Sequence, residues 1–92
     1  MAFLVSEKGL MITDETISSS ETINGSSAKE ISKSLSKNGY TPVGLLAINI
    51  SNDYILLNRF YIDSSGLAHI KVRNVNSANQ SNVQVNASVL WQ

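Results

Sequence analysis

The chain has 92 residues, the length of one small domain, and its seven basic and seven acidic residues give a formal net charge of zero. It has no cysteine, which excludes disulfides and thiolate metal sites, and with a single histidine it predicts no metal or other cofactor. A neutral chain does not attract nucleic acid or anionic lipid over a distance, and the longest apolar stretch, residues 43–50, is too short to span a bilayer. We therefore expect neither nucleic acid nor a membrane as a partner.

The chain is expected to form one domain, with N-terminal strands or an arm in residues 1–26 and a β-sandwich core in residues 27–92. Two short apolar runs, residues 3–5 and 10–12, predict either a small hairpin or an arm that reaches onto a neighbouring subunit. Residues 14–23 are rich in Ser and Thr, with isolated isoleucines as apolar anchors, and predict an irregular strand.

Residues 28–37 are ambiguous between helix and strand. Ala28, Ile31 and Leu35 fit helical spacing, and the following Asn38-Gly39 fits a helix C-cap. The segment also alternates, with Ile31 and Leu35 on one side and serines on the other. Serine weakens a helix and the neighbouring segments have the period of strands, so we predict a strand, with one short helix as the alternative.

The middle of the chain predicts two strands that are apolar on both sides. In residues 41–50 strict alternation places Val43, Leu45 and Ala47 on one side and Leu46, Ile48 and Ile50 on the other. In residues 54–62 it places Tyr54, Leu56, Phe60 and Ile62 on one side and Ile55, Leu57, Arg59 and Tyr61 on the other. Strands of this kind lie centrally in a sheet or have one face covered by another subunit.

The last two strands alternate cleanly between apolar and polar residues. Residues 67–75 direct Ala68, Ile70 and Val72 inward, and residues 82–92 direct four small apolar residues and Trp91 to one side. Turn signals separate strands at short, even intervals, as in residues 24–26 and 63–66. The fold class predicted is all-β, an antiparallel β-sandwich of jelly-roll-like type.

A set of polar and aromatic residues on two of these strands forms the candidate site. His69, Lys71 and Arg73 alternate outward, and with Arg59 and Tyr61 they form a candidate interface or receptor-facing surface. The alternative is an ordinary solvated or intersubunit face, because a lone histidine is usually structural. No catalytic residue is predicted: the serines lack a nucleophile elbow and the carboxylates do not form a pair across strands, so we expect no enzyme.

Three short motifs resemble a known group of proteins. They are Gly39-Tyr40-Thr41-Pro42-Val43-Gly44, Val72-Arg73-Asn74-Val75 and Val89-Leu90-Trp91. Their order from Ser27 to Trp91 resembles the small β-sandwich domains of tail, fibre and minor structural proteins of bacteriophages and prophages of Gram-positive hosts. The resemblance implies a non-enzymatic virion protein, often trimeric, assembled in the bacterial host cytoplasm as a tail, fibre or capsid-decorating component.

The size of the chain points to self-association. A small core without disulfide or metal gains stability from a partner subunit, and two strands with apolar residues on both sides need covering. We expect a homo-oligomer, and the resemblance implies a trimer that also contacts other virion proteins. A carbohydrate- or receptor-binding module, on a virion or a cell surface, is the alternative function, with a host surface glycan as its ligand.

Overall fold

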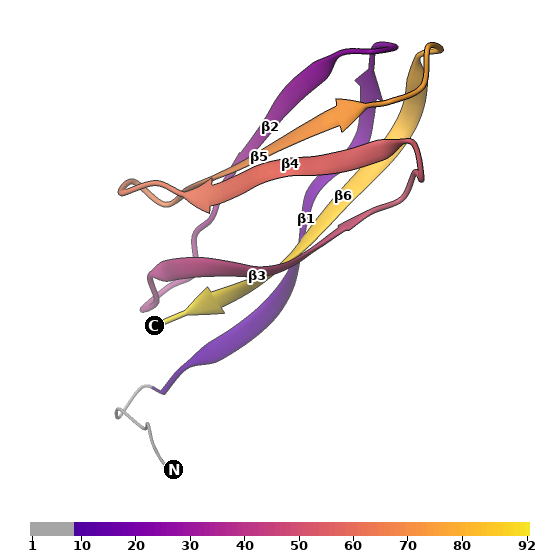
Figure 1. Cartoon of the computed structure of the whole chain (residues 1–92). Helices are drawn as coiled ribbons and strands as arrows, with labels where there is room; N and C mark the ends of the chain where they lie inside the picture. The colour runs from indigo at the N-terminus through magenta and orange to yellow at the C-terminus, as the bar shows by residue number, and fades with distance from the viewer. Residues whose placement is uncertain (1–8) are drawn as a thin grey trace.

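The computed structural model describes residues 9–92, which form six strands and no helix (Figure 1). The strands are β1 (Met11–Ile23), β2 (Ala28–Ser34), β3 (Pro42–Ile50), β4 (Ile55–Ile62), β5 (Leu67–Asn74) and β6 (Gln80–Trp91). The predicted strand in the ambiguous segment is confirmed, because β2 occupies it. Within the described residues, nothing has the form of a helix that crosses a membrane.

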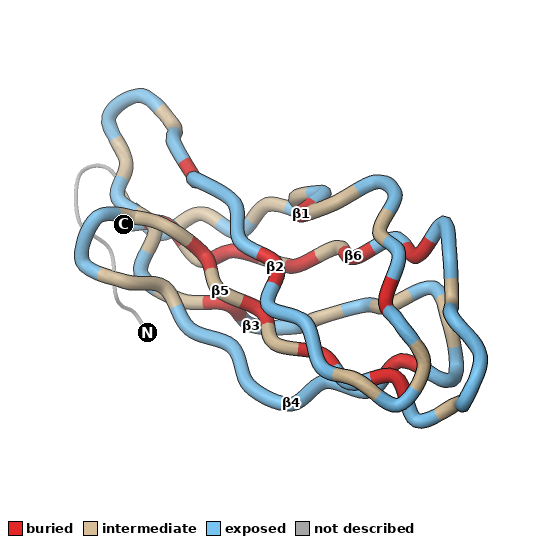
Figure 2. Tube along the Cα trace, turned by 90° about the horizontal axis from the view of Figure 1, so that it is seen from above, coloured by how far each residue is buried: buried red, intermediate tan, exposed pale blue. Residues whose placement is uncertain are grey.

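The strands form two antiparallel sheets of three, in the orders β1-β6-β3 and β2-β5-β4. The two sheets face each other across one apolar core, as in a β-sandwich, and the described part of the chain measures 50 × 25 × 18 Å (Figure 1). Each sheet has a single central strand, β6 or β5, and buried positions concentrate along these two strands (Figure 2). The all-β prediction is confirmed.

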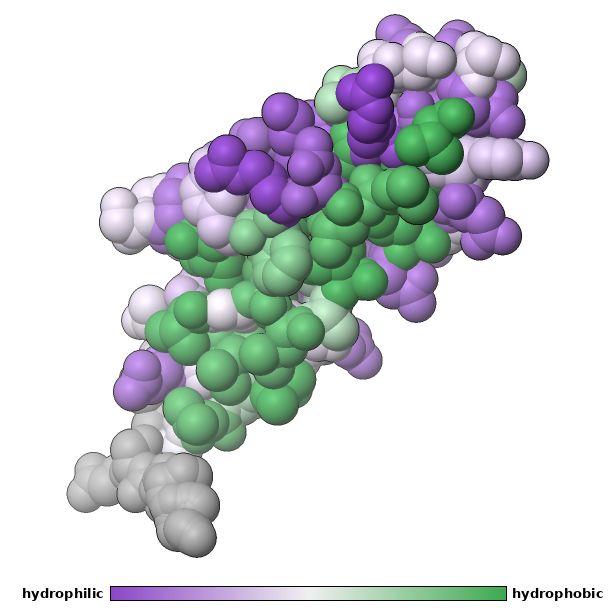
Figure 3. Space-filling view, viewed as in Figure 1, coloured by the Kyte–Doolittle hydropathy of each residue, from purple (hydrophilic) through white to green (hydrophobic). Residues whose placement is uncertain are grey.

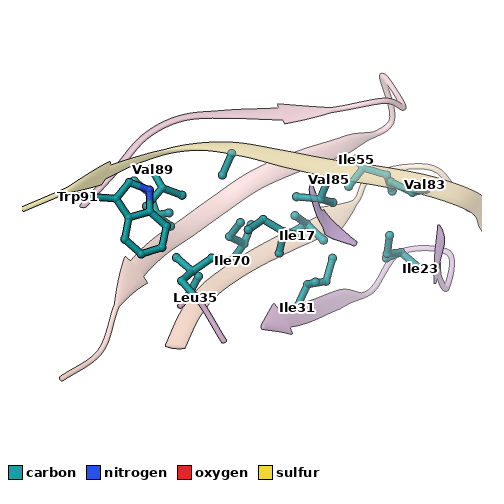
Figure 4. Close-up of a cluster of buried hydrophobic side chains, with 14 residues drawn as sticks. Ile17, Ile23, Ile31, Leu35, Ile55, Ile70, Val83, Val85, Val89 and Trp91 are labelled. Atoms are coloured by element: carbon teal, nitrogen blue, oxygen red, sulfur yellow. The ribbon is translucent and has the colours of Figure 1, made fainter. Parts of the chain in front are cut away.

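Alternation along the two central strands builds most of the core. The inward residues of β6 end at Trp91, and those of β5 include Ile70 and Val72, all nearly or completely buried (Figure 4). Burying one large aliphatic side chain stabilises a fold by roughly 1.5–3 kcal/mol. The whole core consists of Ile17, Ile23, Ile31, Leu35, Leu45, Ile55, Ala68, Ile70, Val72, Val83, Val85, Ala87, Val89 and Trp91.

β-Bulges in β3 change which of its residues face the core. The pairing with β6 skips Val43 and then Leu46, and each extra residue shifts the phase of the alternation. Leu45, Ile48 and Ile50 all pair with buried residues of β6 and so share the inner face. The predicted separation of Leu45 from Ile48 and Ile50 is wrong, because strict alternation does not allow for an inserted residue.

A bulge at Asn58 has the same effect in β4. Leu57 pairs with Val72 and Arg59 with Lys71, so Asn58 has no partner of its own. The inner face of β4 therefore holds Ile55, Leu57, Phe60 and Ile62, and the outer face holds Leu56, Arg59 and Tyr61. The sequence analysis placed Phe60 on the face of the strand opposite to Leu57 and on the same face as Leu56. Both assignments are wrong because, as in β3, strict alternation does not allow for an inserted residue.

β1 belongs to the first sheet, although its residues were expected to form N-terminal strands or an arm. It pairs with β6 along its length, and three register shifts make it the irregular strand that was predicted. Its anchors Ile17 and Ile23 are buried in the core. The predicted hairpin or arm involves residues 3–5, which lie outside the described residues.

Two lysines close the side of the sandwich where β1 lies against β2. The Lys29 amine is 2.7 Å from a carboxylate oxygen of Glu21 and donates a hydrogen bond to the Thr22 carbonyl. The Lys33 amine donates to the Thr16 carbonyl at 2.8 Å. Both lysines lie on the same face of β2 as buried Ile31, and their long stems bridge from one sheet to the other.

Asn74 is a buried polar link between distant segments. Its side chain is completely buried, and its Nδ2 donates to the carbonyls of Ile23 and Ala78, each at 3.0 Å. Its Oδ1 accepts from the Asn76 amide at 2.9 Å. These bonds join the end of β1 to the loop between β5 and β6.

We expect Asn74→Ala to lower the free energy of unfolding by about 2–3 kcal/mol, because it removes three hydrogen bonds of a completely buried side chain, to the Ile23 and Ala78 carbonyls and from the Asn76 amide. Urea denaturation followed by circular dichroism measures this change. The exposed bulge residue offers the control: Asn58→Ala is expected to change stability by less than about 0.5 kcal/mol. Equal effects of the two substitutions would contradict this role of Asn74.

Candidate functional site

The strand register gathers all five predicted candidate residues on one surface. Arg59 pairs with Lys71, Tyr61 pairs with His69, and Arg73 pairs with an outward leucine of β4. All five lie on the outer face of the β2-β5-β4 sheet, which we call the charged face.

Aromatic stacking orders the middle of the charged face. The rings of Tyr61 and His69 are nearly parallel, with 4.6 Å between their centroids and 12° between their planes. The Arg59 guanidinium carbon lies 5.0 Å from the centroid of the Tyr61 ring, within the range of a cation–π contact. Arg59, Tyr61 and His69 therefore form one continuous stack.

His69 is held between two carboxylates from different segments. Its Nδ1 lies 2.9 Å from Glu30 Oε2, and its Nε2 lies 2.8 Å from Asp63 Oδ2. Ionised carboxylates only accept hydrogen bonds, so both ring nitrogens must donate and the ring is the charged imidazolium. In this arrangement neither nitrogen is free to accept a proton from another group, so His69 acts as an ionic anchor.

Hydrogen bonds shift the pKa values of this pair in opposite directions. The Ser65 hydroxyl, followed by the His69 ring and the Leu67 amide, holds the pKa of Asp63 far below its usual 3.8. Asp63, followed by Glu30, raises the pKa of His69 above its usual 6.5. The sequence identified Asp63 only as a turn residue and did not single out Glu30, because only the pairing of β2 with β5 brings Glu30 to His69.

Three cations remain on the charged face. Among residues 9–92, the structure places no carboxylate within ion-pair distance of Arg59, Lys71 or Arg73. The face therefore offers positive charge next to stacked rings, which is chemistry for binding an acidic or polar partner group.

A second surface, which sequence reasoning missed, lies on the outer face of the β1-β6-β3 sheet. It is an open concavity of about 720 Å³ whose lining includes Asp14, Thr16, Asn49, Asn86 and Ser88. The Ser88 hydroxyl donates to Asp14 Oδ1 at 3.0 Å. The Oδ1 atom of Asn86 is buried and has no hydrogen-bond partner among the described residues. We call this surface the polar concavity; its signal in the sequence was the polar side of β6.

The aromatic residues Phe60, Tyr61 and Trp91 do not form one platform on which a sugar could stack. Trp91 is in the core, and its Nε1 donates to the Thr13 hydroxyl at 2.7 Å. Tyr61 lies on the outer face of its sheet, whereas Phe60 lies on the inner face at the edge. The described residues also contain no group of three acidic, histidine or cysteine side chains placed to hold a metal.

Comparison of the chain with family models, with curated proteins and with solved structures finds no match. The fold and the surfaces described above therefore carry the functional argument.

We expect His69 to stabilise the fold more at mildly acidic pH than at alkaline pH. Its folded-state pKa is raised, so the stabilisation is complete below its usual 6.5 and is lost as pH rises through the folded value. The melting temperature of the wild type should exceed that of His69→Gln at about pH 5.5, and the difference should shrink by about pH 9. A difference that does not change over this range would contradict the charged pairing.

Proposed function

We propose that this protein is a non-enzymatic structural component of a bacteriophage particle, a tail, fibre or capsid-decorating protein that acts through self-assembly. The observation that carries the proposal is the number of large apolar residues that remain exposed to solvent in a single copy of the protein. Among residues 9–92, ten such residues are exposed by 40% or more, and apolar side chains gather over β3 and β4 in Figure 3. Contiguous apolar patches beyond a few hundred Å² mark interaction sites in soluble proteins.

The phage assignment rests on the resemblance of residues 27–91 to small domains of phage structural proteins. The strand order adds support for a jelly-roll-like connection. A jelly roll places its first strand beside its last and its second beside its penultimate strand, and β1 beside β6 and β2 beside β5 follow this rule. Jelly rolls are a common architecture of viral capsid proteins.

The same resemblance leads us to propose a trimer. Three copies around one axis suit a subunit 50 Å long and only 25 × 18 Å across, because each copy then contributes one long side to the centre. A chain with zero net charge also has no overall charge repulsion to prevent its copies from associating.

Light scattering coupled to size exclusion tests the proposal at micromolar concentration. A trimer of the 10.0 kDa chain is expected at about 30 kDa. A species of about 20 kDa would remove the trimer but keep self-assembly, and a monomer at every concentration would contradict the structural role. Immunogold labelling of particles from a lysate of the host would then locate the protein in the virion.

A carbohydrate- or receptor-binding module is the second candidate function, and the polar concavity favours it. Its carboxylate, amide and hydroxyl groups are those that recognise sugar hydroxyls, and Asn86 is among the residues that line it. The concavity also has the volume of a small-ligand site. This role is compatible with a place in a virion.

A glycan array followed by titration of any sugar that binds tests this second function. We expect Asp14→Asn and Asn86→Ala to weaken binding by about tenfold or more, since each removes an acceptor for a sugar hydroxyl. The matched control is Asn58→Ala, which changes an exposed amide on the other sheet. Binding that survives both concavity substitutions would exclude this surface as the sugar site.

A further inference from the structure

We propose that copies of this chain pack against one another through the open side of the sandwich between β3 and β4, by side-chain contact and not by strand addition. This inference rests on the proposed self-assembly and names the surface responsible. We call the surface the apolar edge and define it by Val43 and Leu46 of β3 and Leu56, Leu57 and Phe60 of β4. Between 40% and 52% of each of these residues is exposed, and apolar side chains cover this side in Figure 3.

The bulges create the apolar edge. In β4 the extra residue Asn58 brings Leu57 and Phe60 onto the same inner face, opposite buried residues of β5. They lie on an edge strand, so the core covers them only in part. In β3 the extra residues are Val43 and Leu46, and the bulges leave both exposed. Regular strands would have distributed these side chains over opposite faces.

The two open sides of the sandwich, β1–β2 and β3–β4, differ in the side chains that extend across them. At the β1–β2 side, Lys29 and Lys33 extend across the gap and bind backbone carbonyls of β1. Lysines on an edge strand are a known protection against association. At the β3–β4 side, the positions that extend past the core are Leu57 and Phe60, and no lysine lies on either strand. The asymmetry points to the β3–β4 side as the one that becomes covered.

Strand addition is disfavoured at this side. A partner strand needs an uninterrupted row of backbone donors and acceptors, and bulges in both β3 and β4 interrupt that row. Side-chain packing needs no such row. It places apolar residues in the centre of a contact and leaves polar residues such as Asn58 and Arg59 at its rim.

A second copy of the chain fits the apolar edge better than a partner of other chemistry. The edge has no charged side chain among its five defining residues, so a matching surface must also be apolar, and a second copy presents one of equal size. Ile12 of β1 and Gly44 of β3 both pair with Leu90 of the central strand β6, and Gly44 adjoins Val43. Ile12 therefore extends the patch across the outer face of the first sheet. With this extension, six large apolar residues that are each 40–62% exposed form the patch, and contiguous apolar patches beyond a few hundred Å² mark interaction sites on soluble proteins.

A pair of lysine substitutions tests the surface. Val43→Lys adds a charge to the apolar edge, and Ser19→Lys adds one to an exposed position on β1, the edge strand on the other side of the sandwich. We expect Val43→Lys to raise the concentration needed for half-association by about tenfold or more, since the interface would have to bury an unpaired ammonium. Ser19→Lys is expected to leave association unchanged.

Phe60→Lys repeats the test on β4. Analytical ultracentrifugation over a range of concentrations measures the association of the wild type and of every variant. Circular dichroism checks that each variant keeps the strand spectrum, and Leu46→Lys replaces any variant that loses it. If the oligomer resists every edge substitution, this interface is wrong while the self-assembly proposal stands. If the wild type is a monomer at every concentration, both this interface and the self-assembly proposal are contradicted.

Discussion

The constraint that governs this structure is that each of its two sheets has only one central strand. Residues 9–92 supply six strands, so four of them are edges with a row of backbone groups that no neighbouring strand satisfies. The core consequently depends on β5 and β6, whose inward residues are almost entirely buried. Every other feature of the fold is a way of managing the four edges.

The two pairs of edge strands solve this problem by different means. Between β1 and β2, lysine side chains cross the gap and bind carbonyl groups, which both closes the core and charges the edge. Between β3 and β4, bulges disturb the backbone row and turn apolar side chains toward the opening. The first solution suits a surface that stays in water. The second suits a surface that is covered by another protein, and this difference supports the proposed assembly through the β3–β4 side.

The outer faces of the two sheets also differ, and they offer separate functions. The outer face of the β2-β5-β4 sheet carries stacked rings, an ion-paired histidine and three further cations. The outer face of the β1-β6-β3 sheet is hollowed and lined by amide, hydroxyl and carboxylate groups. Leu56 of the apolar edge lies on the first of these outer faces, and Ile12, which extends the edge, lies on the second, so packing through the edge would also cover part of each face.

The sequence by itself determined the strands and the burial of the central ones. Alternation in β5 and β6 was readable because these strands are regular, and it placed Ile70, Val72 and Trp91 in the core correctly. It also placed His69, Lys71 and Arg73 outward. The tertiary structure alone decided the faces of β3 and β4, because a bulge adds one residue without changing composition or local propensity.

Tertiary structure likewise decided the partners of the charged groups. Glu30 is 39 residues from His69 in the chain, and only the pairing of β2 with β5 brings their side chains together. The lysine contacts with β1 and the hollow around Asn86 depend on how one sheet lies against another or twists along its length. Periodicity reports which way a side chain points within its own strand. It contains no information about which distant strand will lie beside it, and that is where the surfaces of this protein arise.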